Sequence, residues 1–171
     1  MRRATYEWLN LLYDRYGPRE FGKLCQKLLA ISYRRAGFIH VVERGVQGVD
    51  VDAAGGHAKF ATEVKTTING AIVFQAKDAA GLNARRADGY LPLLAVLRLS
   101  PLSDWLLADA EHLAPGRLIL DKLRAYRRQD LEAQLRPLFA EVVEQHAESA
   151  LAGAQAYLDR ILCQLGIDQC E

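Results

Sequence analysis

Two short runs, residues 49–53 and 58–66, are joined through Gly55 and Gly56. Both runs alternate apolar and polar side chains, which is typical of a strand with one buried face. Two glycines between such runs supply the positive φ that a tight hairpin turn requires. The sequence therefore predicts a β-hairpin whose two-residue turn is formed by these glycines.

The predicted hairpin gathers charged side chains on one face. In this register Asp50 and Glu63 are diagonal neighbours, with backbones about 7–8 Å apart. Lys65 shares the face of Glu63, because side chains alternate along a strand. Asp52 lies opposite Lys59 in the same register, so we expect a cross-strand ion pair there.

Convergent carboxylates repel each other unless a cation lies between them. Oxygen ligands without histidine or thiolate favour a hard ion such as Mg²⁺ or Mn²⁺. Such an ion polarises a phosphoryl oxygen, and Lys65 adds positive charge where a phosphoryl transition state accumulates negative charge. The residues therefore favour phosphodiester hydrolysis. The alternative is an exposed polar face without chemistry, because Glu-x-Lys alone is common.

Helical and strand patterns surround the hairpin. A helix is predicted over 5–16 and a second one from Pro18 to Gly37, which buries an apolar stripe at three- and four-residue spacing. Further strands are predicted at 38–42, 93–99 and 105–109, and a further helix at 78–86. This order predicts an α/β or α+β fold in which helices cover a sheet.

The tail from Leu118 onward is predicted to be helical, with Pro137 in a first turn. An apolar seam over 138–165 corresponds to a helix about 40 Å long. Such length exceeds what a small domain needs to cover itself, which favours a dimer contact. The alternative is an intramolecular helical hairpin with the segment 121–136.

Charge is distributed unevenly over the 171 residues. Residues 1–130 carry 20 basic and 14 acidic side chains, whereas residues 131–171 carry 2 basic and 7 acidic ones. The first part is therefore expected to attract a polyanion and the tail to repel one. The longest apolar run is too short for a membrane span and no secretory signal is recognisable, so we predict a cytoplasmic protein.

Asp50, followed thirteen residues later by Glu63-Val64-Lys65, resembles the PD-(D/E)XK nuclease superfamily, with Val49 at the proline position. Within it, the stretch from Gly17 to about Leu113 is similar to archaeal-type Holliday junction resolvases. Phe21-x-x-Leu24-x-x-x-Leu28-Leu29 and Gly48-Val49-Asp50 are also similar to Mrr-type restriction endonucleases. The resemblance implies a restriction-endonuclease-like αβββαβ core, with a central mixed sheet flanked by helices, in residues 1–117. Residues 118–171 are expected to form a helical extension.

The resemblance also implies roles for single residues. Asp50 and Glu63 are expected to hold Mg²⁺, for which Mn²⁺ substitutes, with the carbonyl of Val64 as a further ligand. Lys65 is expected to orient or activate the attacking water. Glu20 and Gln75 are further candidates for the site, and the alternative for both is an ordinary place in a first helical turn.

Basic and hydroxyl side chains of the first part are expected to contact DNA phosphates. They are Arg2, Arg3, Lys23, Lys27, Arg34, Arg35, Arg44, Thr66 and Thr67. No base-reading motif is visible, which favours recognition of DNA shape.

We therefore predict a metal-dependent endonuclease that cleaves branched DNA as a homodimer, because two opposed strands need two active sites. The alternatives are a restriction-type or repair endonuclease acting on duplex DNA and a non-catalytic DNA-binding module.

Overall fold

The computed structural model describes residues 1–44, 48–56, 58–101 and 104–170. A six-stranded mixed sheet with the order β6-β5-β3-β2-β1-β8 forms its centre. These strands are β1 (His40–Arg44), β2 (Val51–Gly55), β3 (Ala58–Thr67), β5 (Leu91–Arg98), β6 (Trp105–Asp109) and β8 (Asp168–Cys170). A separate two-stranded ribbon pairs β4 (Ala71–Phe74) with β7 (Gly116–Ile119). The helices are α1 (Arg3–Arg35), α2 (Ala76–Ala87), α3 (Leu120–Leu123), η1 (Arg124–Tyr126) and α4 (Gln129–Gln164).

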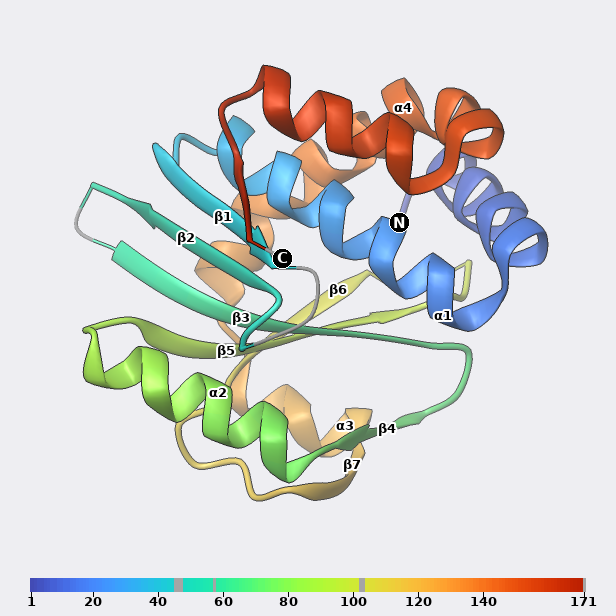
Figure 1. Ribbon diagram of the computed structural model, residues 1–171. Helices are drawn as coiled ribbons and strands as arrows, with labels where there is room; N and C mark the ends of the chain where they lie inside the picture. Colours follow the sequence, from blue (N-terminus) through green and yellow to red (C-terminus); the bar gives the residue numbers. More distant parts are fainter. Residues whose placement is uncertain (45–47, 57, 102–103, 171) are drawn as a thin grey trace.

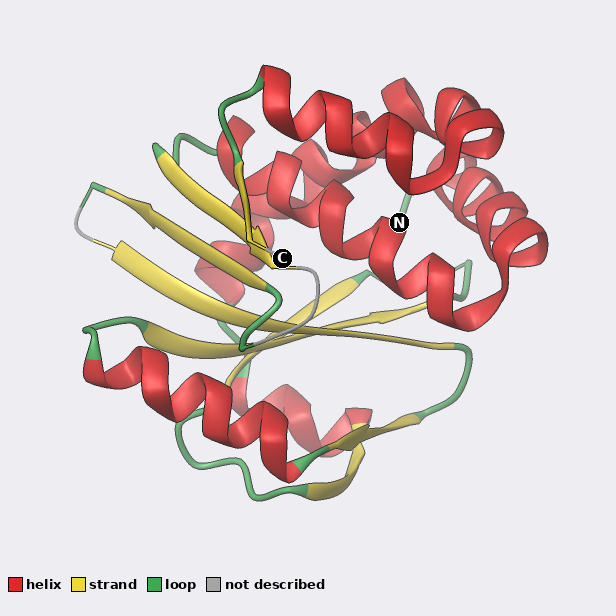
Figure 2. Ribbon diagram, in the orientation of Figure 1, coloured by secondary structure: helices red, strands yellow, loops and turns green. Residues whose placement is uncertain are grey.

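Helices cover both faces of the sheet (Figure 1, Figure 2). The long helices α1 and α4 pack on one face, and α2, α3 and the β4–β7 ribbon lie on the other. The central strand β5 is buried on both sides: Leu93 and Leu97 join the core under α1, and Leu94 and Val96 join the core under α2. This two-sided burial explains why its sequence is continuously apolar. The predicted mixed α/β architecture is confirmed.

The predicted interruption of the first helix is also confirmed. Gly17 adopts φ 72° and ψ 173° inside α1, and Pro18 restarts the helix. The second half of α1 buries the predicted stripe, including Phe21, Leu24 and Leu28. This half of α1 therefore lies against the sheet and becomes one wall of the site described below.

The hairpin of β2 and β3 forms, but the predicted register is wrong. Gly55 pairs with Ala58, so Gly55 belongs to the strand and not to the turn. A Cβ atom on Gly55 would lie 2.9 Å from the Cα of Phe38, too close for any side chain. Glycine is therefore required here for backbone approach to the start of β1.

The tail differs from its prediction in three ways. The segment after Gly116 first forms a strand, β7, and α4 begins only at Gln129, so Pro137 lies inside the helix. α4 is not one straight rod either, because Ala154 takes φ 46° and ψ −138° and breaks it. The Tyr16 hydroxyl lies 3.0 Å from the Ala150 carbonyl oxygen and 2.7 Å from that of Leu151, and so provides a hydrogen-bond partner beside this break.

The apolar seam of the tail packs within the chain. Phe139, Val143, Ala147 and Ala150 are buried in the same core as α1. These buried residues are therefore not available to a second copy. The alternative hairpin with the segment 121–136 does not form, because residues 129–136 are part of α4 itself. Within the described part of the chain, no helix combines the length and the apolar character needed to cross a membrane.

Candidate active site

A cavity of about 340 Å³ opens between the middle of α1, the second half of β3 and the start of α2. The acidic residues of the hairpin face line it together with basic residues of the neighbouring elements. The lining residues that carry acid or base are Arg19, Lys23, Arg44, Asp50, Glu63, Lys65, Lys77 and Asp78. This cavity is the candidate active site.

Asp50 and Glu63 face each other across the hairpin. Val51 pairs with Thr62, so the same register continued by one residue puts Asp50 directly opposite Glu63 rather than diagonal to it. The backbone N–H of Val64 donates a hydrogen bond of 2.7 Å to Oδ2 of Asp50. This bond fixes the Asp50 carboxylate beside β3, so the two acids are closer neighbours than the sequence predicted.

Lys65 is held between two carboxylates. Its Nζ lies 2.6 Å from Oε1 of Glu63 and 2.8 Å from Oδ2 of Asp78. Asp78 is itself fixed, because the Gln75 N–H donates to its Oδ2 at 2.8 Å within a capping box at the start of α2. The helix terminus thus positions the lysine ammonium next to the paired acids.

The approach of α2 to the loop before Asp50 depends on a small residue. A Cβ atom on Gly81 would lie 3.2 Å from the carbonyl carbon of Gly48, which is tight for a backbone neighbour. Gly81 therefore lets α2 pack closely against the chain that leads into Asp50.

Burial and mutual repulsion shift the titration of the site. Burial raises the pKa of Glu63 to about 8, and the charge of Asp50 contributes to this shift. Burial likewise raises the pKa of Asp50 to about 6, although the Val64 N–H favours its carboxylate form. Burial opposes the charge of Lys65, yet Glu63 and Asp78 keep the pKa of its ammonium above the ordinary value.

The carboxylate oxygens of Asp50 and Glu63 suit a hard divalent cation as ligands. In the part of the chain that the structure describes, no three His, Cys, Asp or Glu side chains converge as a complete ligand set. Two carboxylates nevertheless suit Mg²⁺, which keeps several waters and takes only one or two carboxylates from a protein. Burial and the charge of Asp50 together raise the pKa of Glu63, and a bound cation would favour its carboxylate form.

The raised pKa of Glu63 predicts a pH-dependent stability. A carboxyl group whose pKa is raised on folding stabilises the fold while it is protonated and loses that contribution as pH rises. In metal-free buffer we expect the melting temperature to decrease as the pH rises from 4.5, the ordinary pKa of a glutamate, to about 8, the pKa of Glu63 in the fold. Thermal melting followed by circular dichroism across this range measures it.

Glu63→Gln is the matched control for this titration, because its side chain cannot ionise. At high pH Glu63→Gln is expected to melt above wild type, and this difference is expected to shrink as the pH falls and Glu63 becomes protonated. Added Mg²⁺ is expected to raise the melting temperature of wild type most at high pH. Parallel pH profiles for the two proteins would contradict the assignment.

The structure brings Gln75 into the cavity but not Glu20. Gln75 lines the same cavity as Asp50 and Glu63. Glu20 is hydrogen-bonded by Gln155 of α4 and lies 3.7 Å from the ammonium of Lys23, and it is not among the described residues that line the cavity. Glu20 therefore braces α1 against α4.

Asp52 is a structural ion-pair residue, but its predicted partner is wrong. In the observed register Asp52 lies opposite Ala61, and it is 1% exposed. Its carboxylate accepts hydrogen bonds from Arg44 at 2.9 Å and from Arg85 at 3.2 Å. The physical reason is the register, in which Lys59 pairs with Ala54 and not with Asp52.

The predicted phosphate contacts divide into two groups. Lys23 and Arg44 line the cavity, and Thr66 and Thr67 border a neighbouring one. Lys23 and Arg44 face the cavity although they also pair with Glu20 and Asp52. The other five lie outside both cavities and contact groups of the chain: Arg2 with Glu141 and Glu144, Arg3 with Glu7, Lys27 with Glu43 and Asp159, Arg34 with the carbonyls of Leu165 and Ile39, and Arg35 with Gln145.

Lys27 is the clearest correction in this set. Its side chain is 7% exposed, and its Nζ lies 2.9 Å from Oε2 of Glu43 and 2.7 Å from Oδ1 of Asp159. Because β1 and α4 cover this position, Lys27 does not reach a DNA phosphate.

Two residues of the site were missed from the sequence. Asp78 was included only as the start of a helix, although its spacing from Gln75 is that of a capping box. Gln26 donates to the backbone carbonyl oxygens of Arg44 and Asp50, at 2.7 and 3.2 Å, and so ties α1 to the acidic strand. No spacing rule points to Gln26, because its partners lie on another element.

Comparison with known proteins places the fold. No family profile and no curated protein matches the sequence. Among solved structures, the chain is similar to Hjc, a Holliday junction resolvase from the archaeal hyperthermophile Archaeoglobus fulgidus, with a TM-score of 0.50 and 18% sequence identity. The match covers 61% of this chain and 89% of the resolvase. The chain therefore has the fold of this resolvase, a mixed sheet flanked by helices, and adds residues that the match does not cover.

Proposed function

We propose that this chain is a divalent-metal-dependent endonuclease of the PD-(D/E)XK superfamily that cleaves branched DNA. One observation carries the proposal: the carboxylates of Asp50, just before β2, and Glu63, on β3, line a cavity with the Lys65 ammonium, and Lys23 and Arg44 border it. Acids, an amine and flanking cations are the groups that phosphodiester hydrolysis requires. The fold shared with a Holliday junction resolvase supports a branched substrate.

The proposed roles follow from position and charge. Asp50, Glu63 and the carbonyl of Val64 would hold a cation such as Mg²⁺ or Mn²⁺, which when bound acidifies water and stabilises charge on a phosphoryl oxygen. Lys65, oriented by Asp78, donates hydrogen bonds toward the scissile phosphate. Lys23 and Arg44 bind the adjoining phosphates and fix the backbone in the cavity.

A resolvase cuts two opposed strands, so we propose that the chain acts as a symmetric homodimer. The buried part of the tail seam packs against α1, which favours an interface elsewhere on the chain. Sedimentation or light scattering of the full chain gives the mass that tests this proposal.

Cleavage of matched DNA substrates tests the function. We expect Mg²⁺ to support paired, symmetric nicks near the crossover of an immobile four-way junction, and no nicks on linear duplex of the same sequence. Mn²⁺ is expected to replace Mg²⁺, and EDTA to stop cleavage. Preference for linear duplex would contradict the branched substrate, and binding of the junction without cleavage would contradict an enzyme.

A further inference from the structure

The β4–β7 ribbon has one buried and one open face. Ile72 and Phe74 are 7% and 1% exposed and pack into the core under α2. Val73 and Ile119 point the other way and are 62% and 45% exposed. Arg117 pairs directly with Val73 across the ribbon, so it shares the open face. The open face therefore carries one arginine and two exposed apolar side chains.

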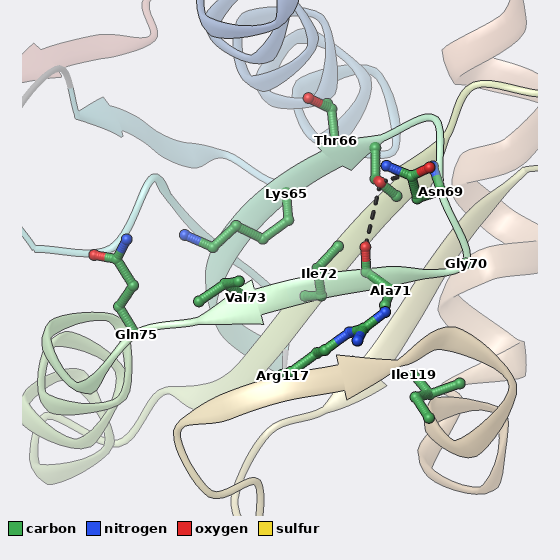
Figure 3. A pocket seen from close by; sticks show the side chains of 11 residues that line it. Lys65, Thr66, Asn69, Gly70, Ala71, Ile72, Val73, Gln75, Arg117 and Ile119 are labelled. Atoms are coloured by element: carbon green, nitrogen blue, oxygen red, sulfur yellow. Dashed lines mark hydrogen bonds between the residues drawn. The ribbon is translucent and has the colours of Figure 1, made fainter.

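A cavity of about 840 Å³ lies between the open face and the end of β3 (Figure 3). Its polar side chains include Lys65, Asn69, Gln75 and Arg117, and none of its described lining residues is acidic. Among the residues that the structure describes, Arg117 has no carboxylate partner. The Thr67 hydroxyl accepts from the Asn69 N–H at 2.9 Å and lies 3.3 Å from the Ala71 carbonyl oxygen, so it braces the turn between β3 and β4. The charge of the cavity therefore suits an anion.

This ribbon cavity continues directly into the candidate active site. Lys65 and Gln75 line both cavities. Figure 3 shows Lys65 extending toward Gln75 at one end of the ribbon cavity, whereas Asn69 and Gly70 close the other end. An extended ligand that lies along the ribbon therefore reaches the paired acids.

We propose that the ribbon cavity binds the sugar-phosphate backbone of the DNA strand next to the scissile phosphate, with Arg117 on a phosphate. The inference rests on the proposed function and assigns it a strand-binding surface. Arginine and amide side chains are common phosphate contacts, and Val73 and Ile119 suit the apolar faces of deoxyribose. Two apolar side chains beside an arginine offer far less than the ~800 Å² per partner of a stable protein interface, which argues against a second copy here.

Junction binding in EDTA separates strand binding from cleavage. Wild type, Arg117→Ala and Arg117→Glu are titrated with a fluorescent four-way junction at several NaCl concentrations. We expect Arg117→Glu to raise Kd by about tenfold at 0.1 M salt. Arg117→Ala is expected to lower the slope of log Kd against log [NaCl] by about 1, which corresponds to the loss of one phosphate contact. Arg160→Ala is the matched control, because Arg160 is an exposed arginine on α4, on the opposite face of the sheet, and its Kd is expected to stay at the wild-type value.

The outcomes distinguish this inference from the proposed function. If wild type binds and cleaves the junction while both Arg117 variants keep its Kd and salt dependence, the ribbon assignment is overturned and the nuclease remains. If Val73→Asp halves the mass in light scattering without changing Kd, the face is a contact between copies and the assignment is overturned. If wild type neither binds nor cleaves any DNA, the proposed function itself fails.

Discussion

Lys65→Ala is expected to lower the rate of junction cleavage by about a thousandfold, because it removes a preorganised cation from the position where negative charge develops. Asp50→Asn is expected to cause a similar loss by removing one of the two charges that hold the metal. Junction affinity is expected to stay within a few-fold of wild type for both, since most of the affinity for DNA comes from the other basic side chains that contact the phosphates. Single-turnover cleavage and Kd measured in parallel give both values.

Asp78→Asn extends the same series to a positioning residue. It leaves Asp50 and Glu63 intact but weakens the ion pair that orients Lys65, so we expect a loss of about 10- to 100-fold. Two matched controls are expected to cut at the wild-type rate: Lys59→Ala on the same strand as Lys65, and Asp88→Asn at the end of the same helix as Asp78. Wild-type cleavage by Lys65→Ala would contradict the site assignment, and wild-type cleavage by Asp78→Asn would contradict the positioning role.

The sequence predicted the parts of the fold that depend on residues close together in the chain. The three- and four-residue spacing of Phe21, Leu24 and Leu28 marks the buried side of α1 without reference to any other element. Gly17 and Pro18 mark the break in α1 for the same reason. The tolerance of glycine for positive φ and the fixed φ of proline belong to the residues themselves and need no distant contact. The alternation in β3 similarly brought Glu63 and Lys65 onto one face.

The features that sequence missed depend on distant contacts. The strands β4 and β7 have four residues each and pair across about forty intervening positions, so neither segment carries a periodic signal long enough to recognise. The turn was misplaced because Gly55 is required by the approach of Phe38, and not by the turn itself. Ala154 breaks α4 although nothing in its residue type indicates a break.

The same distinction applies to the site. That Asp50, Glu63 and Lys65 line one cavity was predictable, because hairpin alternation and motif spacing agree on them. Asp78 was missed because its role depends on the approach of α2 to β3. Lys27 was assigned to DNA because the helix periodicity of α1 does not reveal that β1 and α4 cover this face.

Lys27→Ala is accordingly expected to destabilise the fold rather than to weaken DNA binding. The Glu43 carboxylate is 3% exposed, and without Lys27 its remaining partner among the described residues is Gln26, which donates a hydrogen bond of 2.6 Å. Leaving a buried charge without its ion-pair partner costs about 3–5 kcal/mol. A protein of this size loses about 2–4 °C of melting temperature per kcal/mol, so we expect a drop on the order of 10 °C. Thermal melting of the full chain at neutral pH measures it.

Two further variants separate ion pairing from phosphate contact. Lys23→Ala removes a half-exposed lysine one turn earlier on α1, and is expected to weaken junction binding with little change in melting temperature. Lys27→Met combined with Glu43→Met removes both charges, and is expected to recover most of the stability, because apolar side chains of similar volume replace a buried ion pair at little cost. If Lys27→Ala melted like wild type and bound the junction more weakly, Lys27 would be a phosphate contact, and the packing of α4 over this face would be wrong.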